Sequence, residues 1–111
     1  MNENYVNHAE ELIMDQINSA KKMCQGLIDA LSEGKLDKDL AGELLSNAKN
    51  ILANAFNQKI ELASQMGWNY EKIEDDKSFE LKSLDDAVYS CLDKLDVKNN
   101  TYDNEIDELL R

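Results

Sequence analysis

The stretch that decides the fold is residues 4–66, which read NYVNHAEELIMDQINSAKKMCQGLIDALSEGKLDKDLAGELLSNAKNILANAFNQKIELASQM. Apolar residues recur every three or four positions on both sides of one short turn at residues 32–37. That spacing is typical of amphipathic α-helices, and a turn this short joins two helices side by side in opposite directions. The sequence therefore predicts a long antiparallel helical hairpin.

The ends of both hairpin helices carry recognisable signals. The first helix is expected from Asn4 to Ser32, with Gly34 just beyond its end. The second is expected to follow a cap at Asp37, supported by a hydrophobic contact between Leu36 and Ala41, and to end near Gly67. Alanines recur in the second helix at positions 41, 48, 55 and 63. Small residues in that rhythm let the facing helix approach closely.

The C-terminal part predicts shorter elements. Residues 67–82 are expected to form an ordered loop with a short extended piece, and a minor β-hairpin is the alternative left open there. Two shorter helices, 83–96 and 101–110, are expected to follow, with a break at Asn99-Asn100. They are expected to pack on the hairpin, where Phe56 and Ile60 receive them. The predicted fold is an all-α single domain over residues 1–111, a small helical bundle.

Composition limits the location and the ligands. The chain has 111 residues with 23 acidic and 12 basic side chains, a formal net charge of −11. Nucleic acid and anionic membranes repel such a chain, so direct binding to either is not expected. The N-terminus does not resemble a secretory signal, and no segment has the roughly 20 apolar residues of a membrane span. A cytoplasmic location is expected, with Cys24 and Cys91 as buried free thiols.

Motifs for catalysis and metal binding are incomplete. One histidine, His8, and two distant cysteines do not supply a zinc site, and the di-iron motif is absent. The segment 96–107 resembles a calcium loop in composition. However, Lys98 stands at the third position, which supplies a ligand, and Thr101 stands at the sixth, where glycine is required. Phosphate-binding loops and nucleophile–base pairs are missing. We therefore predict a protein without enzymatic activity, cofactor or metal.

Carboxylates are concentrated towards the C-terminus, and this run is the predicted partner-binding surface. One interpretation is a solvated helical face that keeps the protein soluble. The sharper hypothesis is that the carboxylates imitate the phosphates of nucleic acid and block a basic groove. In size and charge the chain resembles small acidic inhibitors of phages and mobile elements, including many anti-CRISPR proteins, without a shared motif. The resemblance implies that the partner is a basic nucleic-acid-binding protein. The candidate residues are Asp85, Asp86, Asp93, Asp96, Asp103, Glu105, Asp107 and Glu108.

Two further hypotheses concern assembly. The long hairpin is similar to that of WXG-type secretion partners, and residues 89–93 (YSCLD) fit a Tyr-x-x-x-Asp export pattern. The interhelical turn at residues 32–35 reads SEGK, however, and lacks the Trp-x-Gly of that family. Self-association, as in a homodimer, would instead bury apolar residues that the C-terminal part leaves uncovered. The residues marked for this role are Leu12, Met14, Ile28, Phe56 and Ile60.

Overall fold

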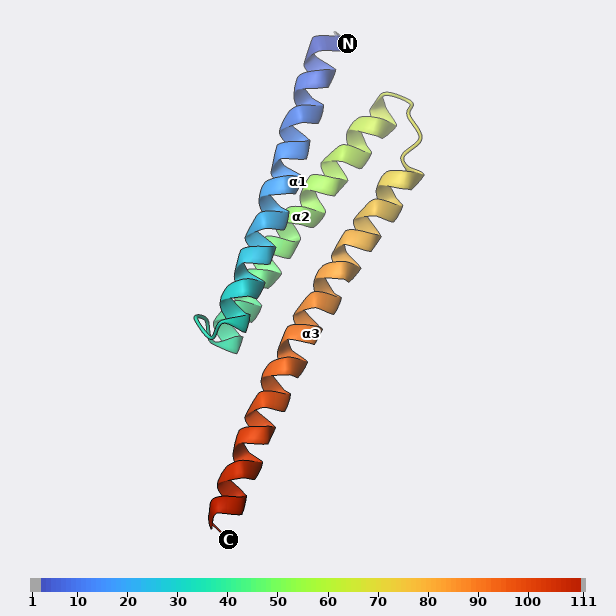
Figure 1. Cartoon of the computed structure of the whole chain (residues 1–111). Helices are drawn as coiled ribbons and strands as arrows, with labels where there is room; N and C mark the ends of the chain where they lie inside the picture. Colours follow the sequence, from blue (N-terminus) through green and yellow to red (C-terminus); the bar gives the residue numbers. More distant parts are fainter. Residues whose placement is uncertain (1–2, 111) are drawn as a thin grey trace.

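The computed structural model describes the backbone of residues 3–110 and the side chains of residues 5–95. Three α-helices make up the fold: α1 (Glu3–Ser32), α2 (Lys38–Gln65) and α3 (Glu71–Leu110). The first two form an antiparallel hairpin, and α3 runs back along it, roughly parallel to α1 (Figure 1). The predicted all-α helical bundle is confirmed, and residues 3–110 contain no β-strand.

The turn between α1 and α2 is built as its residues predict. The Asp37 side chain accepts hydrogen bonds from the N–H groups of Asp39 at 2.7 Å and Leu40 at 3.4 Å. Gly34 has a φ of 75°, which a residue with a side chain adopts only with strain. This conformation lets the N–H of Lys35 donate to the Ala30 carbonyl at 2.9 Å and close the end of α1.

The core lies along the line where the three helices meet. Four of the five alanines of α2, at positions 41, 48, 55 and 63, are buried, together with Leu52 and Phe56 on the same helix. Since an alanine side chain ends at Cβ, α1 can lie close against α2, as the seven-residue rhythm predicted. Ile73, Leu81 and Leu84 of α3 pack against the cluster that contains Phe56. The cluster that contains Phe56 therefore receives α3, as expected, whereas Ile60 is half-buried and is not part of that cluster.

The C-terminal part is where the sequence prediction is wrong. Neither a loop nor a β-hairpin occupies residues 71–82, because α3 already begins at Glu71, whose N–H donates to the Asn69 side chain at 2.9 Å. The connection from α2 is short, and in it Gly67 has a φ of 74°. The helix then continues without the predicted break at 99–100. One helix thus replaces the two shorter helices predicted at 83–96 and 101–110.

The apolar spacing of the sequence did not predict the start of α3, because two charged residues interrupt it. Lys77 and Glu80 occupy positions on the side of α3 that faces the hairpin, between Ile73 and Leu84. Their partners lie on the hairpin itself. Lys77 Nζ donates to the Asn57 side chain at 2.8 Å, and Glu80 accepts from Lys21 Nζ at 3.0 Å. Because polar groups fill two consecutive inward turns, the apolar period appears interrupted although the helix is not.

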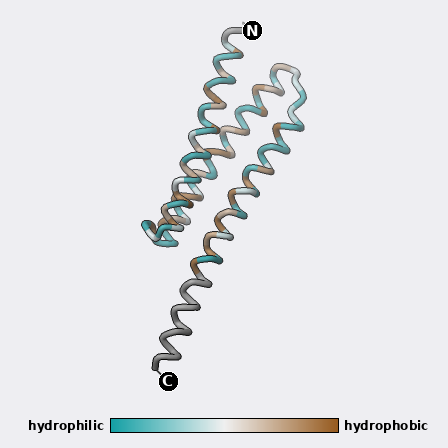
Figure 2. Tube along the Cα trace, in the orientation of Figure 1, coloured by the Kyte–Doolittle hydropathy of each residue, from teal (hydrophilic) through white to brown (hydrophobic). Residues whose placement is uncertain are grey.

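The molecule is long and thin. Its extents are 75 × 23 × 15 Å and its radius of gyration is 19.5 Å, against roughly 13 Å for a compact chain of this length. The backbone of α3 runs past the turn between α1 and α2 (Figure 1). Hydrophobic and hydrophilic residues are interspersed along α1, along α2 and along the coloured part of α3 (Figure 2). Within the part of the chain that the structure describes, no helix is both long and apolar enough to cross a bilayer.

Candidate partner-binding surface

Three polar contacts fix the orientation of α3 on the hairpin. Besides the contacts of Lys77 and Glu80, Lys49 Nζ on α2 lies 2.6 Å from Asp85 Oδ1 on α3. Apolar contacts hold the same side of α3, where Cys91 is buried in a cluster with Ile28, Leu31 and Ala41. Because the inward side of the helix is fixed at several points along its length, its outward side is also defined.

The outward side of α3 presents a tyrosine between two carboxylates. Asp86, Tyr89 and Asp93 are spaced three and four residues apart, so they lie next to one another on the helix surface. All three are exposed, and Tyr89 has 68% of its surface accessible. We call these three residues the α3 patch. Exposure alone does not distinguish Tyr89, because Tyr5 (72%) and Phe79 (69%) are at least as exposed; what distinguishes it is its position between two exposed carboxylates.

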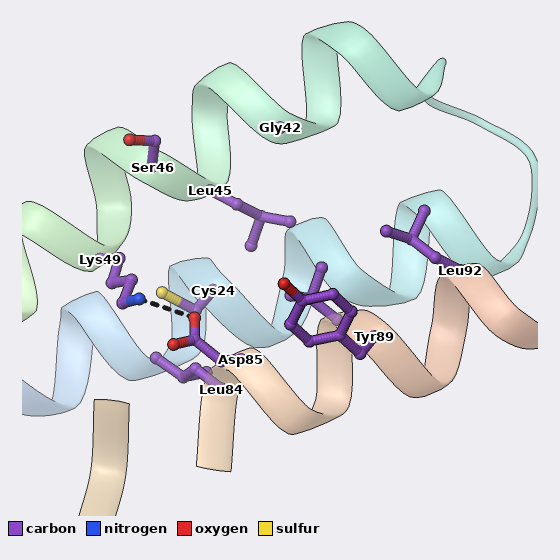
Figure 3. Close-up of a pocket in the computed structure, with 10 residues that line it drawn as sticks. Cys24, Gly42, Leu45, Ser46, Lys49, Leu84, Asp85, Tyr89 and Leu92 are labelled. Carbon is purple, nitrogen blue, oxygen red and sulfur yellow. Dashed lines mark hydrogen bonds and ion pairs between the residues drawn. The ribbon is translucent and has the colours of Figure 1, made fainter. Parts of the chain in front are cut away.

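A groove of about 340 Å³ adjoins the α3 patch. It runs between α2 and α3, with Tyr89 at its rim and the Lys49–Asp85 ion pair at one end (Figure 3). Cys24 of α1 also lines it. The remaining lining is mostly apolar and comprises Gly42, Leu45, Ser46, Leu84, Val88 and Leu92. A space of this size and polarity suits an apolar side chain or a small apolar ligand.

The groove offers weak nucleophilic chemistry. Burial raises the pKa of the Cys24 thiol above its ordinary value of 9.0, and a hydrogen bond to the backbone offsets this only in part. The thiol is therefore protonated at neutral pH, and a protonated thiol is a poor nucleophile. Among the residues with described side chains, no group of three or more His, Cys, Asp and Glu is placed to hold a metal ion.

The predicted site residues divide into three groups. Asp86 and Asp93 are exposed on α3 and belong to the α3 patch. Asp85 does not, because it turns towards α2 and pairs with Lys49. The other five belong to the part of α3 whose backbone is described but whose side chains are not. They are Asp96, Asp103, Glu105, Asp107 and Glu108.

Sequence reasoning missed two features of this surface. Tyr89 was noted only as part of an export pattern, although its spacing from Asp86 and Asp93 places it beside them on any helix. The first turns of α3 also expose four carboxylates, on Glu71, Glu74, Asp75 and Asp76, in a segment predicted to be a loop. Continuing the helix back through Lys77 and Glu80 would have placed these carboxylates on α3.

Comparison with known proteins gives no match: no family model, no curated protein and no solved structure is similar to this chain. The fold and the surface define the class only as a three-helix protein with an exposed acidic and aromatic patch beside an apolar groove.

Proposed function

We propose that this protein is a non-enzymatic protein-binding module that acts as an inhibitor. In this proposal its α3 patch and the adjoining groove bind a basic protein that handles nucleic acid. The observation that carries the proposal is Tyr89, 68% exposed between two exposed carboxylates and at the rim of an apolar groove. Tyrosines in such positions supply much of the binding energy in protein interfaces.

The chemistry of the α3 patch favours cationic side chains on the partner. Asp86 and Asp93 can each accept charge-assisted hydrogen bonds from arginine or lysine. The Tyr89 ring between them can stack on a guanidinium group, a contact worth about 0.5–2 kcal/mol. The net charge of −11 adds long-range attraction towards a basic surface and accelerates encounter.

The groove adds a place for an apolar contact. A basic surface alone would bind any acidic protein weakly and without orientation, because exposed ion pairs are worth little. An apolar side chain of the partner inserted between α2 and α3, next to Tyr89, would be removed from water and would fix the orientation. This combination supports a specific complex rather than general electrostatic attraction.

A nucleic-acid-handling partner follows from the sign of the charge. Proteins that bind nucleic acid present basic surfaces to phosphates, and carboxylates can occupy the same surfaces. The two patch carboxylates are separated by about 10 Å along α3, whereas phosphates recur about every 3.4 Å of duplex axis along one strand. We therefore propose competition for a basic site and not a phosphate-by-phosphate copy of a duplex.

Affinity capture with matched variants tests this proposal. The patch variant combines Asp86→Asn, Asp93→Asn and Tyr89→Ala. Its control, Asp15→Asn, Glu43→Gln and Tyr70→Ala, also removes two exposed carboxylates and one exposed tyrosine. The wild type and the control should capture the same basic protein from a lysate of the source cells. The patch variant should lose it, and high salt should release it from the wild type.

The same experiment can contradict the proposal. If the patch variant and the control capture equal amounts of the partner, the α3 patch is not the binding surface. If the captured protein has no nucleic-acid-binding activity, the α3 patch serves a different class of partner.

A further inference from the structure

The hairpin has a second face that α3 does not cover. α3 meets the hairpin on one side only, through residues such as Lys21 on α1 and Lys49 on α2. On the other side five large apolar side chains are between 37% and 50% exposed. They come from both helices, and we call them the open hairpin face: Leu12, Met23, Leu40, Leu44 and Ile51.

The open hairpin face carries no charge between its apolar residues. The positions that separate them along the same sides of α1 and α2 are Gln16, Ser19, Asn47 and Asn54, all exposed. In α2 the series 40, 44, 47, 51, 54 alternates steps of four and three, the spacing of a helix–helix seam. Charged residues make up 32% of the chain, so an uncharged strip along two long helices is a marked departure.

The whole uncovered side of the hairpin, of which the open hairpin face is the apolar part, is large enough for a stable interface. The 28 residues of α2 span roughly 40 Å at 1.5 Å per residue. Two adjacent helices, each about 10 Å across, give a face of about 800 Å². This is the area that each partner buries in a protein–protein interface of standard size.

We propose that the open hairpin face binds a second copy of this chain, so that two hairpins form an antiparallel four-helix bundle. Each copy has a net charge of −11, so a surface free of carboxylates is where two copies can pack with the least repulsion. The open hairpin face is such a surface. A twofold axis repeats every contact, so an uncharged amide of one copy that meets an amide of the other forms the same pair twice.

The sizes of the side chains on the open hairpin face also favour the packing of one hairpin against another. Ser19 and Gly26 lie on α1 close to Met23, while α2 contributes Leu44 and Ile51. A Cβ placed on Gly26 would have no described atom within 4 Å, so nothing within the described part of the molecule requires a glycine there. Small residues on α1 would give the larger side chains of α2 in the other copy room to approach.

The set of residues suited to assembly changes accordingly. Of the five residues that the sequence marked, Ile28 and Phe56 are buried within the chain, and Ile60 is half-buried. Met14 lines a separate hollow with Trp68 and Ile73. Leu12 alone belongs to the open hairpin face. In the proposed dimer each copy's α3 lies on the outside, so both α3 patches stay accessible.

Mass in solution tests the dimer on the full chain. Light scattering after size exclusion, over a wide dilution series, should give twice the chain mass of 12.6 kDa, falling to 12.6 kDa on dilution. Higher salt should strengthen the dimer, because it screens the repulsion between two acidic copies. Salt should thus act on the dimer in the opposite direction to its effect on a basic partner at the α3 patch.

Charged substitutions on the open hairpin face should break the dimer whatever their sign. The pair Leu44→Glu and Ile51→Glu, and separately Leu44→Lys and Ile51→Lys, should each raise the dissociation constant by roughly 100-fold or more. The lysine pair makes the chain less acidic, so its effect cannot be attributed to added repulsion. Asn18→Glu with Asn50→Glu, at exposed positions away from this face, should leave the dimer in place.

Circular dichroism checks that each variant remains helical, which is expected because the substituted side chains are exposed in one copy. A wild-type mass of 12.6 kDa throughout the series would overturn the proposal. A dimer that survives the lysine pair would overturn it as well, since the interface would then lie elsewhere.

Discussion

Lys49 Nζ on α2 lies 2.6 Å from Asp85 Oδ1 on α3, and this ion pair distinguishes the surroundings of two neighbouring aspartates. Asp85 turns towards the hairpin, whereas Asp86, one residue on, is rotated by about 100° around the helix and is exposed. The pair therefore helps to fix which side of α3 faces outward. It also engages one of the predicted partner-binding residues in a contact within the chain.

A double-mutant cycle should give this ion pair a small coupling energy. Both side chains are more than one-third exposed, so water screens the attraction. Combining Lys49→Ala with Asp85→Ala should give about 0.2–1 kcal/mol of coupling in urea denaturation. A coupling of several kcal/mol would show that the pair is far less hydrated than its exposure indicates.

Leu52 should be among the most costly residues to truncate. It is fully buried on α2, at the point where the three helices meet. Leu52→Ala should lower the free energy of unfolding by about 2–5 kcal/mol, because it leaves a cavity. Phe79→Ala removes a larger side chain that is 69% exposed and should change stability by about 0.5 kcal/mol or less. Similar losses for both variants would contradict the described core.

Two glycines should respond to alanine in opposite ways. Gly34 has a positive φ at the end of α1, so Gly34→Ala should destabilise the protein by about 1 kcal/mol. Gly42 lies inside α2, where an added Cβ would contact no described atom. Gly42→Ala should therefore stabilise the protein by up to about 1 kcal/mol. Thermal unfolding should give a lower melting temperature than the wild type for Gly34→Ala and a higher one for Gly42→Ala.

The hairpin could be predicted because its local signals agree with its packing. Asp37 caps α2, Gly34 closes α1, and the alanines at positions 41, 48, 55 and 63 are buried against the neighbours of α2, as the sequence indicated. α3 could not be predicted in the same way. Lys77 and Glu80 face the hairpin because Asn57 and Lys21 satisfy them, and those partners are distant in sequence. The spacing of apolar residues carries no information about such pairing.

The candidate surface was predictable in part for a related reason. The sequence identified α3 as acidic, and helix periodicity alone would have placed Tyr89 beside Asp86 and Asp93. It could not tell Asp85 from Asp86, because that difference depends on the position of Lys49 on another helix. The groove beside Tyr89 depends on all three helices and has no counterpart in a local pattern.

Alkaline pH should weaken the fold through Cys24. Burial raises the pKa of this thiol in the folded protein above the ordinary value of 9.0. Below pH 9.0 both states keep the proton and the contribution to stability is fully present. Above pH 9.0 the unfolded thiol ionises while the folded one is still protonated, so the free energy of unfolding falls until the folded pKa is passed.

Urea titrations at neutral pH and above pH 9.0 measure this effect. Cys24→Ala should lose less stability than the wild type on going to the higher pH. Cys91→Ala, which removes another buried thiol, should keep the pH dependence that Cys24 causes. Equal losses for the wild type and Cys24→Ala would rule out Cys24 as the origin of the alkaline weakening.

Competition with nucleic acid tests the proposed inhibition most directly. The captured basic partner is bound to a fluorescent oligonucleotide, and the wild type, the patch variant and the matched control are each titrated in while anisotropy is followed. The wild type and the control should release the oligonucleotide at stoichiometric amounts, and the patch variant should not. If the wild type binds the partner while the oligonucleotide stays bound, the α3 patch does not compete for the nucleic-acid site and the proposed inhibition is wrong.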